Sequence, residues 1–178
     1  MTIGSADDCG KEESLSESPN TRIRERIEEE LEQLTIELDN VRPLFEKLAQ
    51  HEPDAVEMRA AALTLHGFYN GVEAVFLIIA KYVDRQVPND VRWHRQLLDQ
   101  MTRSTDKRAA VIDQSDYDTL VEYLSFRHMV RHNYPGTLNW DRFREIARRL
   151  EQSHNRIDHR IRQFLTETLD RRFDQTDS

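Results

Sequence analysis

The sequence predicts an all-α protein, an up-and-down bundle of four long or medium helices plus one short helix. Apolar residues recur every three or four positions in several long windows, which is the spacing of one face of an α-helix. Only five Gly and five Pro occur in 178 residues, and no window alternates convincingly like a strand. We expect a single domain over residues 21–172.

The net charge of −8 is concentrated near the N-terminus. Residues 1–60 carry 7 Lys and Arg against 16 Asp and Glu, whereas residues 61–178 carry 18 against 17. An acidic chain is not expected to coat nucleic acid through bulk charge, although a local phosphate-handling cleft fits the neutral remainder. The Ser- and Glu-rich residues 1–20 are expected to form a disordered acidic tail, and residues 173–178 a flexible end.

The cellular compartment is predicted from three absences. The one cysteine, Cys9, excludes an internal disulfide and favours a reducing compartment. The chain has no continuous apolar run of about 18 residues and no N-terminal signal-peptide pattern. We therefore expect a cytoplasmic protein with no membrane association.

The first helix is expected to begin near Thr21. Pro43 lies inside its pattern, so a kink or break is expected near residues 40–42. Its apolar residues, separated alternately by four and three positions, form a stripe that packs along a neighbouring helix. The stripe is Ile27, Leu31, Leu34, Leu38, Val41, Phe45 and Leu48.

The second helix is expected from Asp54, as its N-cap, to Asp84. Its second half is apolar on most sides, which is typical of a central helix. Gly67 and Gly71 each cost about 1 kcal/mol of helix propensity relative to Ala, which favours close approach of another helix or a ligand. The neighbouring polar residues are either paired core groups or candidates to line a cleft. They are His66, Tyr69, Asn70 and Glu73.

A short helix is expected after a turn at Pro88, with Asn89 or Asp90 as its cap. The residues of its inner face are Trp93, Leu97, Leu98 and Met101. His94 is expected to pack or to face solvent, and not to take part in catalysis.

The next helix is expected to start at Ser115, where Ser115 and Asp118 resemble a capping box. Its inner stripe is predicted to be Tyr117, Leu120 or Val121, and Leu124. The following positions of the stripe are Arg127, His128 and Arg131, where a helix that only packs would carry apolar residues.

Asn139 is expected to cap a last long helix. Arginines on its outer faces alternate with acidic residues, which is typical of a solvated surface. His154, on the apolar stripe, is expected to be a core or interface histidine. The stripe is Phe143, Ala147, Leu150, His154, Ile157, Ile161, Phe164 and Thr168.

The residues 127–134 carry the candidate chemistry. They read Arg127-His128-Met129-Val130-Arg131-His132-Asn133-Tyr134, and Pro135-Gly136 follow. A charged helix end would suit the C-terminal dipole, but it does not explain cations on the inner stripe. A metal site at His128 and His132 is disfavoured, because no acidic residue or Cys nearby completes a ligand set and the arginines repel cations.

Two further interpretations stay open, anion or nucleotide binding without chemistry and phosphodiester cleavage. Cleavage of RNA needs a group that titrates near neutral pH to move the proton of the 2′-OH, and His is suited to this. It also needs a fixed cation at the phosphate, for which Arg is better suited than Lys. The residues alone favour these two interpretations slightly over a structural helix end.

Arg127, His132 and Tyr134 form the pattern R-x4-H-x-Y, and the chain resembles HEPN-domain ribonuclease toxins of the HepT type. The resemblance spans roughly residues 25–165. The other similar segments are Leu65-His66-Gly67-Phe68-Tyr69 with Gly71 and Glu73, Pro88 with Trp93-His94-Arg95-Gln96-Leu97-Leu98, Phe126-Arg127-His128, and Arg131-His132.

The resemblance implies a HEPN-like bundle that forms a homodimer and acts as the toxin of a type VII-like toxin–antitoxin pair. It implies a metal-independent endoribonuclease with no cofactor, in which Arg127 holds the scissile phosphate and His132 is the acid and base. His128, Arg131 and Asn133 would support them. It also implies a minimal nucleotidyltransferase antitoxin of the MntA type, which transfers AMP from ATP to Tyr134. The alternative is a non-catalytic helical dimer that binds a nucleotide or a protein partner.

Overall fold

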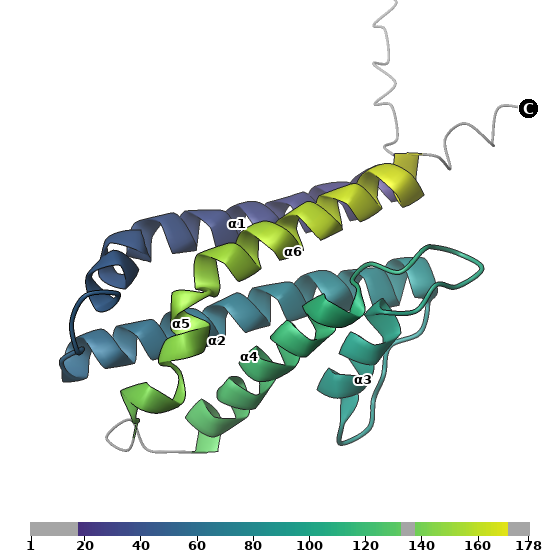
Figure 1. Ribbon diagram of the computed structural model, residues 1–178. Helices are drawn as coiled ribbons and strands as arrows, with labels where there is room; N and C mark the ends of the chain where they lie inside the picture. The colour runs from purple at the N-terminus through teal and green to yellow at the C-terminus, as the bar shows by residue number, and fades with distance from the viewer. Residues whose placement is uncertain (1–17, 133–137, 171–178) are drawn as a thin grey trace, which may run out of the picture.

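The computed structural model describes residues 18–132 and 138–170, and within these ranges it contains helices and no strand. The predicted all-α fold is confirmed. Figure 1 shows α2 between α1 on one side and α4 with α3 on the other. The α-helices are α1 (Pro19–Leu48), α2 (Ala55–Ile78), α3 (Trp93–Met101), α4 (Gln114–His132), α5 (Arg144–Arg148) and α6 (Leu150–Phe164). Two π-helical segments, η1 (Ile79–Asp84) and η4 (Leu165–Asp170), and one 3-10 turn, η3 (Trp140–Arg142), complete them.

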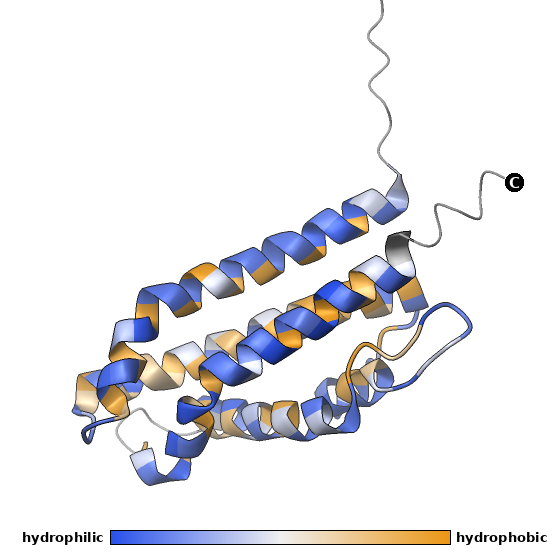
Figure 2. Ribbon diagram, turned by 45° about the horizontal axis from the view of Figure 1, so that its top comes forward, coloured by the Kyte–Doolittle hydropathy of each residue, from blue (hydrophilic) through white to orange (hydrophobic). Residues whose placement is uncertain are grey.

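Helix α1 begins two residues earlier than expected, at Pro19. The Ser18 side chain accepts a hydrogen bond from the Thr21 N–H at 3.1 Å, and Pro occupies the first helical position, where a missing N–H costs nothing. Of the kink or break expected near residues 40–42, the break is not found, because the helix continues through Pro43 to Leu48. Figures 1 and 2 show its last turns bending toward the start of α2. Figure 2 also shows mostly hydrophilic residues on α1, with a stripe of apolar ones.

Helix α2 begins as predicted. Asp54 and Glu57 form a capping box, in which the Asp54 side chain accepts from the N–H groups of Val56 and Glu57. The helical span reaches Asp84 through η1, also as predicted. By length and composition Ala55–Asp84 could cross a membrane, but 61% of its most apolar window is buried inside the fold. This burial is the pattern of the core helix of a soluble protein.

The two glycines of α2 lie against α1, which confirms that another helix approaches closely here. A Cβ built on Gly71 would lie 2.5 Å from the nearest Leu34 side-chain carbon, and one built on Gly67 would lie 3.0 Å from a Glu37 carboxylate oxygen. Leu34 is buried, whereas Glu37 is exposed. Only at Gly71, therefore, is the neighbour unable to move aside.

The two glycines make a matched pair for a stability experiment. Gly71→Ala should lower the free energy of unfolding by about 1–3 kcal/mol, because the methyl group overpacks a closed helix contact. Gly67→Ala should leave stability unchanged or raise it by up to about 1 kcal/mol through helix propensity. Urea denaturation of both variants measures the difference. Equal effects of the two changes would contradict the close approach at Gly71.

The caps of α3 and α4 differ from those expected. The residue before α3 is Arg92, and Asp90 accepts the Arg92 N–H at 2.6 Å in the preceding turn, so neither Asn89 nor Asp90 caps the helix. At α4 the capping pair is Asp113 and Asp116, with N–H to carboxylate distances of 2.9 and 3.1 Å, and not Ser115 and Asp118. Arg156 and Arg160 of α6 also bind Asp113 and Asp116, so tertiary ion pairs stabilise this register.

The predicted last long helix is divided into η3, α5, α6 and η4. Asn139 does act as a cap, but of the 3-10 turn, where its side chain accepts the Asp141 N–H at 2.9 Å. Trp140 and Phe143 are buried where the helix is interrupted: the Phe143 ring packs on Phe126, with centroids 4.9 Å apart, and the Trp140 ring packs on Phe143 at 5.1 Å. His154 is a core histidine, as predicted: it is 8% exposed and lies 3.3 Å from the Thr35 hydroxyl.

Candidate functional site at the end of α4

Arg127 lies on the inner face of α4, as predicted, and is 8% exposed. Three groups hold its guanidinium. The Nε–H donates to Asn70 Oδ1 at 2.8 Å, an Nη1–H donates to His94 Nε2 at 3.3 Å, and Nη2 lies 3.7 Å from Glu73 Oε2. A buried arginine is costly unless its charge is paired and hydrogen-bonded; here Glu73 pairs the charge, and Asn70 and His94 each accept one hydrogen bond.

The predicted stripe on α4 is confirmed at Leu120 and Leu124, which are buried, but it is wrong at His128 and Arg131, which are exposed. The buried stripe passes through Leu120, Tyr123 or Leu124, and Arg127, so it is rotated by a fraction of a turn from the expected one. The His132 side chain, Asn133 and Tyr134 lie outside the described residues. Their roles therefore stay predictions.

The polar residues of α2 lie on the side of the helix that faces α4. Asn70 and Glu73 bind Arg127 directly, and the Tyr69 ring lies 6.0 Å from its guanidinium carbon. Burial, and next the Glu73 carboxylate, raise the pKa of the Tyr69 hydroxyl, so this tyrosine stays protonated. His66 lies on the same side, within the electrostatic influence of Arg127 and Arg131.

His94 was expected to have only a packing or surface role, yet its ring lies among the polar groups. Its Nδ1 pairs with Glu73 Oε1, its Nε2 accepts from Arg127, and its ring stacks on Trp93 with centroids 3.6 Å apart. The sequence did contain a signal for it. Glu73 is an acidic residue on the most apolar helix, and a buried carboxylate requires partners. We call Tyr69, Asn70, Glu73, His94 and Arg127 the arginine cluster.

The histidine at position 66 should titrate below its usual range. Burial, followed by the charges of Arg127 and Arg131, lowers the pKa of His66 from its usual 6.5. As the pH falls, the unfolded chain therefore takes up this proton before the folded protein does. His66 should lower the free energy of unfolding as the pH falls from about 6.5 to the pKa of His66 in the folded protein, and it should not lower it above pH 6.5. An NMR titration of the His66 ring should show a midpoint below pH 6.5, and the substitution Arg131→Gln should raise this midpoint. A midpoint unchanged by Arg131→Gln would contradict the contribution of that arginine.

The arginine cluster has the features of an anion-binding site that is already ordered. The contacts above use one N–H each from Nε, Nη1 and Nη2, and a guanidinium has five. Within the part of the chain that the structure describes, the second donor of Nη1 and that of Nη2 have no such contact, and these are the donors that a phosphate oxygen could use. Among the described residues, no group of three or more His, Cys, Asp and Glu is arranged to hold a metal ion.

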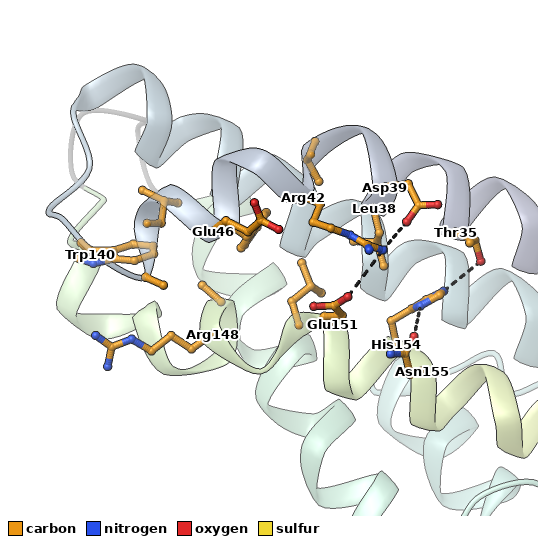
Figure 3. Close-up of a pocket in the computed structure, with 16 residues that line it drawn as sticks. Thr35, Leu38, Asp39, Arg42, Glu46, Trp140, Arg148, Glu151, His154 and Asn155 are labelled. Atoms are coloured by element: carbon orange, nitrogen blue, oxygen red, sulfur yellow. Dashed lines mark hydrogen bonds and ion pairs between the residues drawn. The ribbon is translucent and has the colours of Figure 1, made fainter.

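A cavity with a volume of about 370 Å³ lies elsewhere, between α1 and the α5–α6 region. Figure 3 shows two sets of contacts among its lining residues, in which Arg42 reaches Asp39 and Glu151, and His154 meets Thr35. No residue of the arginine cluster lines it. Cavity size alone therefore does not identify the site with the candidate chemistry.

A search of curated proteins and a search of solved structures found no match. A protein-family comparison did find one: a family described as HepT-like protein matches residues 60–168, which is more than half of the chain. The matched region includes α3, α4 and nearly all of α2, and thus every residue of the arginine cluster. The chain therefore belongs to the HepT-like family of HEPN toxins.

Proposed function

We propose that this protein is the toxin of a type VII-like toxin–antitoxin pair and that it cleaves RNA. Arg127 carries this proposal. It is a buried arginine fixed by α2 and α3, with donors to spare, and it lies five residues before His132 at the end of α4. Membership of the HepT-like family supports the toxin role.

In the proposed reaction the 2′-oxygen of the RNA attacks the adjacent phosphorus, and the bond from phosphorus to the 5′-oxygen breaks. His132 takes the proton of the 2′-OH as the base, and its protonated imidazole then returns this proton to the leaving 5′-oxygen, which yields a 2′,3′-cyclic phosphate and a 5′-OH. Arg127 stabilises the charge that grows on the phosphate oxygens. The nucleophile belongs to the substrate, so the reaction does not depend on a metal-bound water.

We also propose that the working unit is a homodimer. One helix end presents a single Arg127 and His132 and encloses no substrate, whereas two copies that meet there would form a cleft. His128 and Arg131 are exposed on α4 beside Arg127, and with Asn133 they would support the substrate in such a cleft.

The proposed control is AMP transfer from ATP to Tyr134 by an MntA-type nucleotidyltransferase antitoxin. The tyrosine lies two residues after His132. Each added phosphate would bring negative charge to the motif that contains Arg127, and would occupy the anion site and repel RNA.

The nuclease and its control can be tested separately. Purified unmodified protein should cleave RNA in the presence of EDTA and leave cyclic phosphate ends, and absence of cleavage would contradict the nuclease. Co-expression with the antitoxin should add one or more AMP masses to the intact protein, and Tyr134→Phe should prevent this. An unchanged mass after co-expression would overturn the control mechanism while leaving the nuclease unaffected.

One observation favours a non-catalytic binding protein as the second candidate. Glu73 already pairs with Arg127 inside the subunit, so the arginine has a structural role before any ligand binds. On this alternative the chain forms a helical dimer that binds a nucleotide or protein partner, and Arg127 and His132 affect binding without cleavage. Toxicity on expression without the antitoxin would favour the nuclease.

A further inference from the structure

Arg127 is held by a chain of contacts that begins on α2. Glu73 is 7% exposed and contacts both His94, through Oε1, and Arg127, through Oε2. His94 in turn contacts Arg127 through Nε2, at 3.3 Å. The three side chains come from three helices and close a ring of polar contacts at the base of the proposed site.

The chemistry of the donors determines the proton position in this ring. An arginine N–H can only donate, so His94 Nε2 must accept and carries no proton. A carboxylate can only accept, so His94 Nδ1 must carry the proton that is donated to Glu73. The imidazole is therefore neutral, in the Nδ1–H tautomer. A second proton on Nε2 would place two donors against each other.

Other contacts fix the plane of the imidazole. Trp93 stacks on the His94 ring with an interplanar angle of 30°, and the His128 ring meets it edge-on at 5.7 Å. The charged and titratable groups found against His94 are Glu73 from α2 and Arg127 and His128 from α4. With its tautomer and plane both fixed, the Nε2 lone pair points in one direction, which is toward Arg127.

We propose that Glu73 and His94 are a positioning pair for Arg127. Glu73 fixes the Nδ1–H tautomer of His94, and the Nε2 lone pair of His94 holds one Nη1–H of the guanidinium. Together with the Asn70 contact at Nε, this contact directs the remaining N–H donors of Arg127 toward the proposed phosphate site. Neither residue of the pair touches RNA. This inference rests on the proposed nuclease function only for its effect on the rate.

The tautomer can be measured without any activity. In a long-range ¹H–¹⁵N spectrum of the full-length protein at pH 7.5, His94 should show the Nδ1–H form, the reverse of the preference of free imidazole, because the hydrogen bond at one ring nitrogen sets the proton position. Glu73→Leu should shift His94 toward the Nε2–H form. An Nε2–H or doubly protonated His94 in the wild type would overturn the proposal.

The effect on the reaction separates positioning from packing. His94→Leu should lower kcat for RNA cleavage about 10- to 100-fold with little change in KM, which is the scale of losses when a group that orients a site is removed. His94→Gln should recover part of the loss, because its amide oxygen can accept from Arg127. The matched control is His159→Leu, which changes an exposed histidine on α6 and should retain the wild-type kcat.

The proposal would be overturned if His94→Leu and the wild type had equal kcat values. It would also be overturned if His94→Gln recovered none of the lost kcat although both variants unfolded at the same temperature. If the wild type cleaves no RNA, the nuclease function fails on its own. The tautomer measurement then still decides whether Glu73 and His94 hold Arg127.

Discussion

Arg127→Ala should reduce RNA cleavage at least about 100-fold, since removal of a single fixed donor to a developing oxyanion already costs that much in other enzymes. The change removes the cation from the proposed phosphate site and also the partner of Asn70 and His94. Glu73 keeps His94 as a partner, so the bundle should still fold. Cleavage of labelled RNA in EDTA measures the effect.

Two further variants sharpen the Arg127 experiment. Arg127→Lys keeps the positive charge, but an ammonium group cannot reproduce the three-sided contact with Asn70, His94 and Glu73, so its kcat should also fall severely. Arg162→Ala removes an exposed arginine of α6 that pairs with Asp158, and it should cleave like the wild type. Wild-type cleavage by a folded Arg127→Lys or Arg127→Ala protein would remove Arg127 from the mechanism. His132→Ala should be as inactive as Arg127→Ala.

The fold could be predicted from the sequence wherever an apolar stripe continued without competition. The stripe of α1 and the capping Asp54 of α2 gave those helices nearly correct limits. Predictions based on local caps failed where tertiary contacts were stronger. Asp116 is 1% exposed and bonded to two arginines of α6, which determines the start of α4, and no local pattern at Ser115 contains that information.

The candidate site was predictable in its centre but not in its contacts. The apolar period of α4 correctly indicated that Arg127 replaces a core residue, because burial follows from helical spacing alone. His94 contacts Glu73, which lies 21 positions earlier in the sequence, and Arg127, which lies 33 positions later. A single sequence does not show that residues so far apart along the chain lie together in space. The prediction that His94 packs or faces solvent was based on its position beside Trp93, since a histidine beside a core tryptophan usually packs.

Arg108 and Asp84 form another buried ion pair that supports this geometry. The Arg108 side chain is 0% exposed, and its Nε and Nη2 bind the two carboxylate oxygens of Asp84 at 2.7 Å each. The guanidinium also donates to the backbone carbonyls of Arg103, Ala109 and Gln100. The pair thus ties the end of the α2–η1 helix to α3 and to the loop before α4, and α2 and α3 carry four of the five residues of the arginine cluster.

Arg108→Met should therefore lower the free energy of unfolding by about 3–5 kcal/mol, because it leaves the Asp84 carboxylate buried without its cation. The double change Arg108→Met with Asp84→Leu should restore part of this loss, since a buried ion pair replaced as a whole by apolar groups is often nearly neutral. Arg162→Met is the matched control and should cost less than about 1 kcal/mol, because its pair with Asp158 is exposed to solvent. Denaturant unfolding of the three variants measures these differences. If Arg108→Met costs no more than Arg162→Met, the pair does not anchor α3, and the position of His94 must depend on its own contacts, which include Glu73, Arg127 and Trp93.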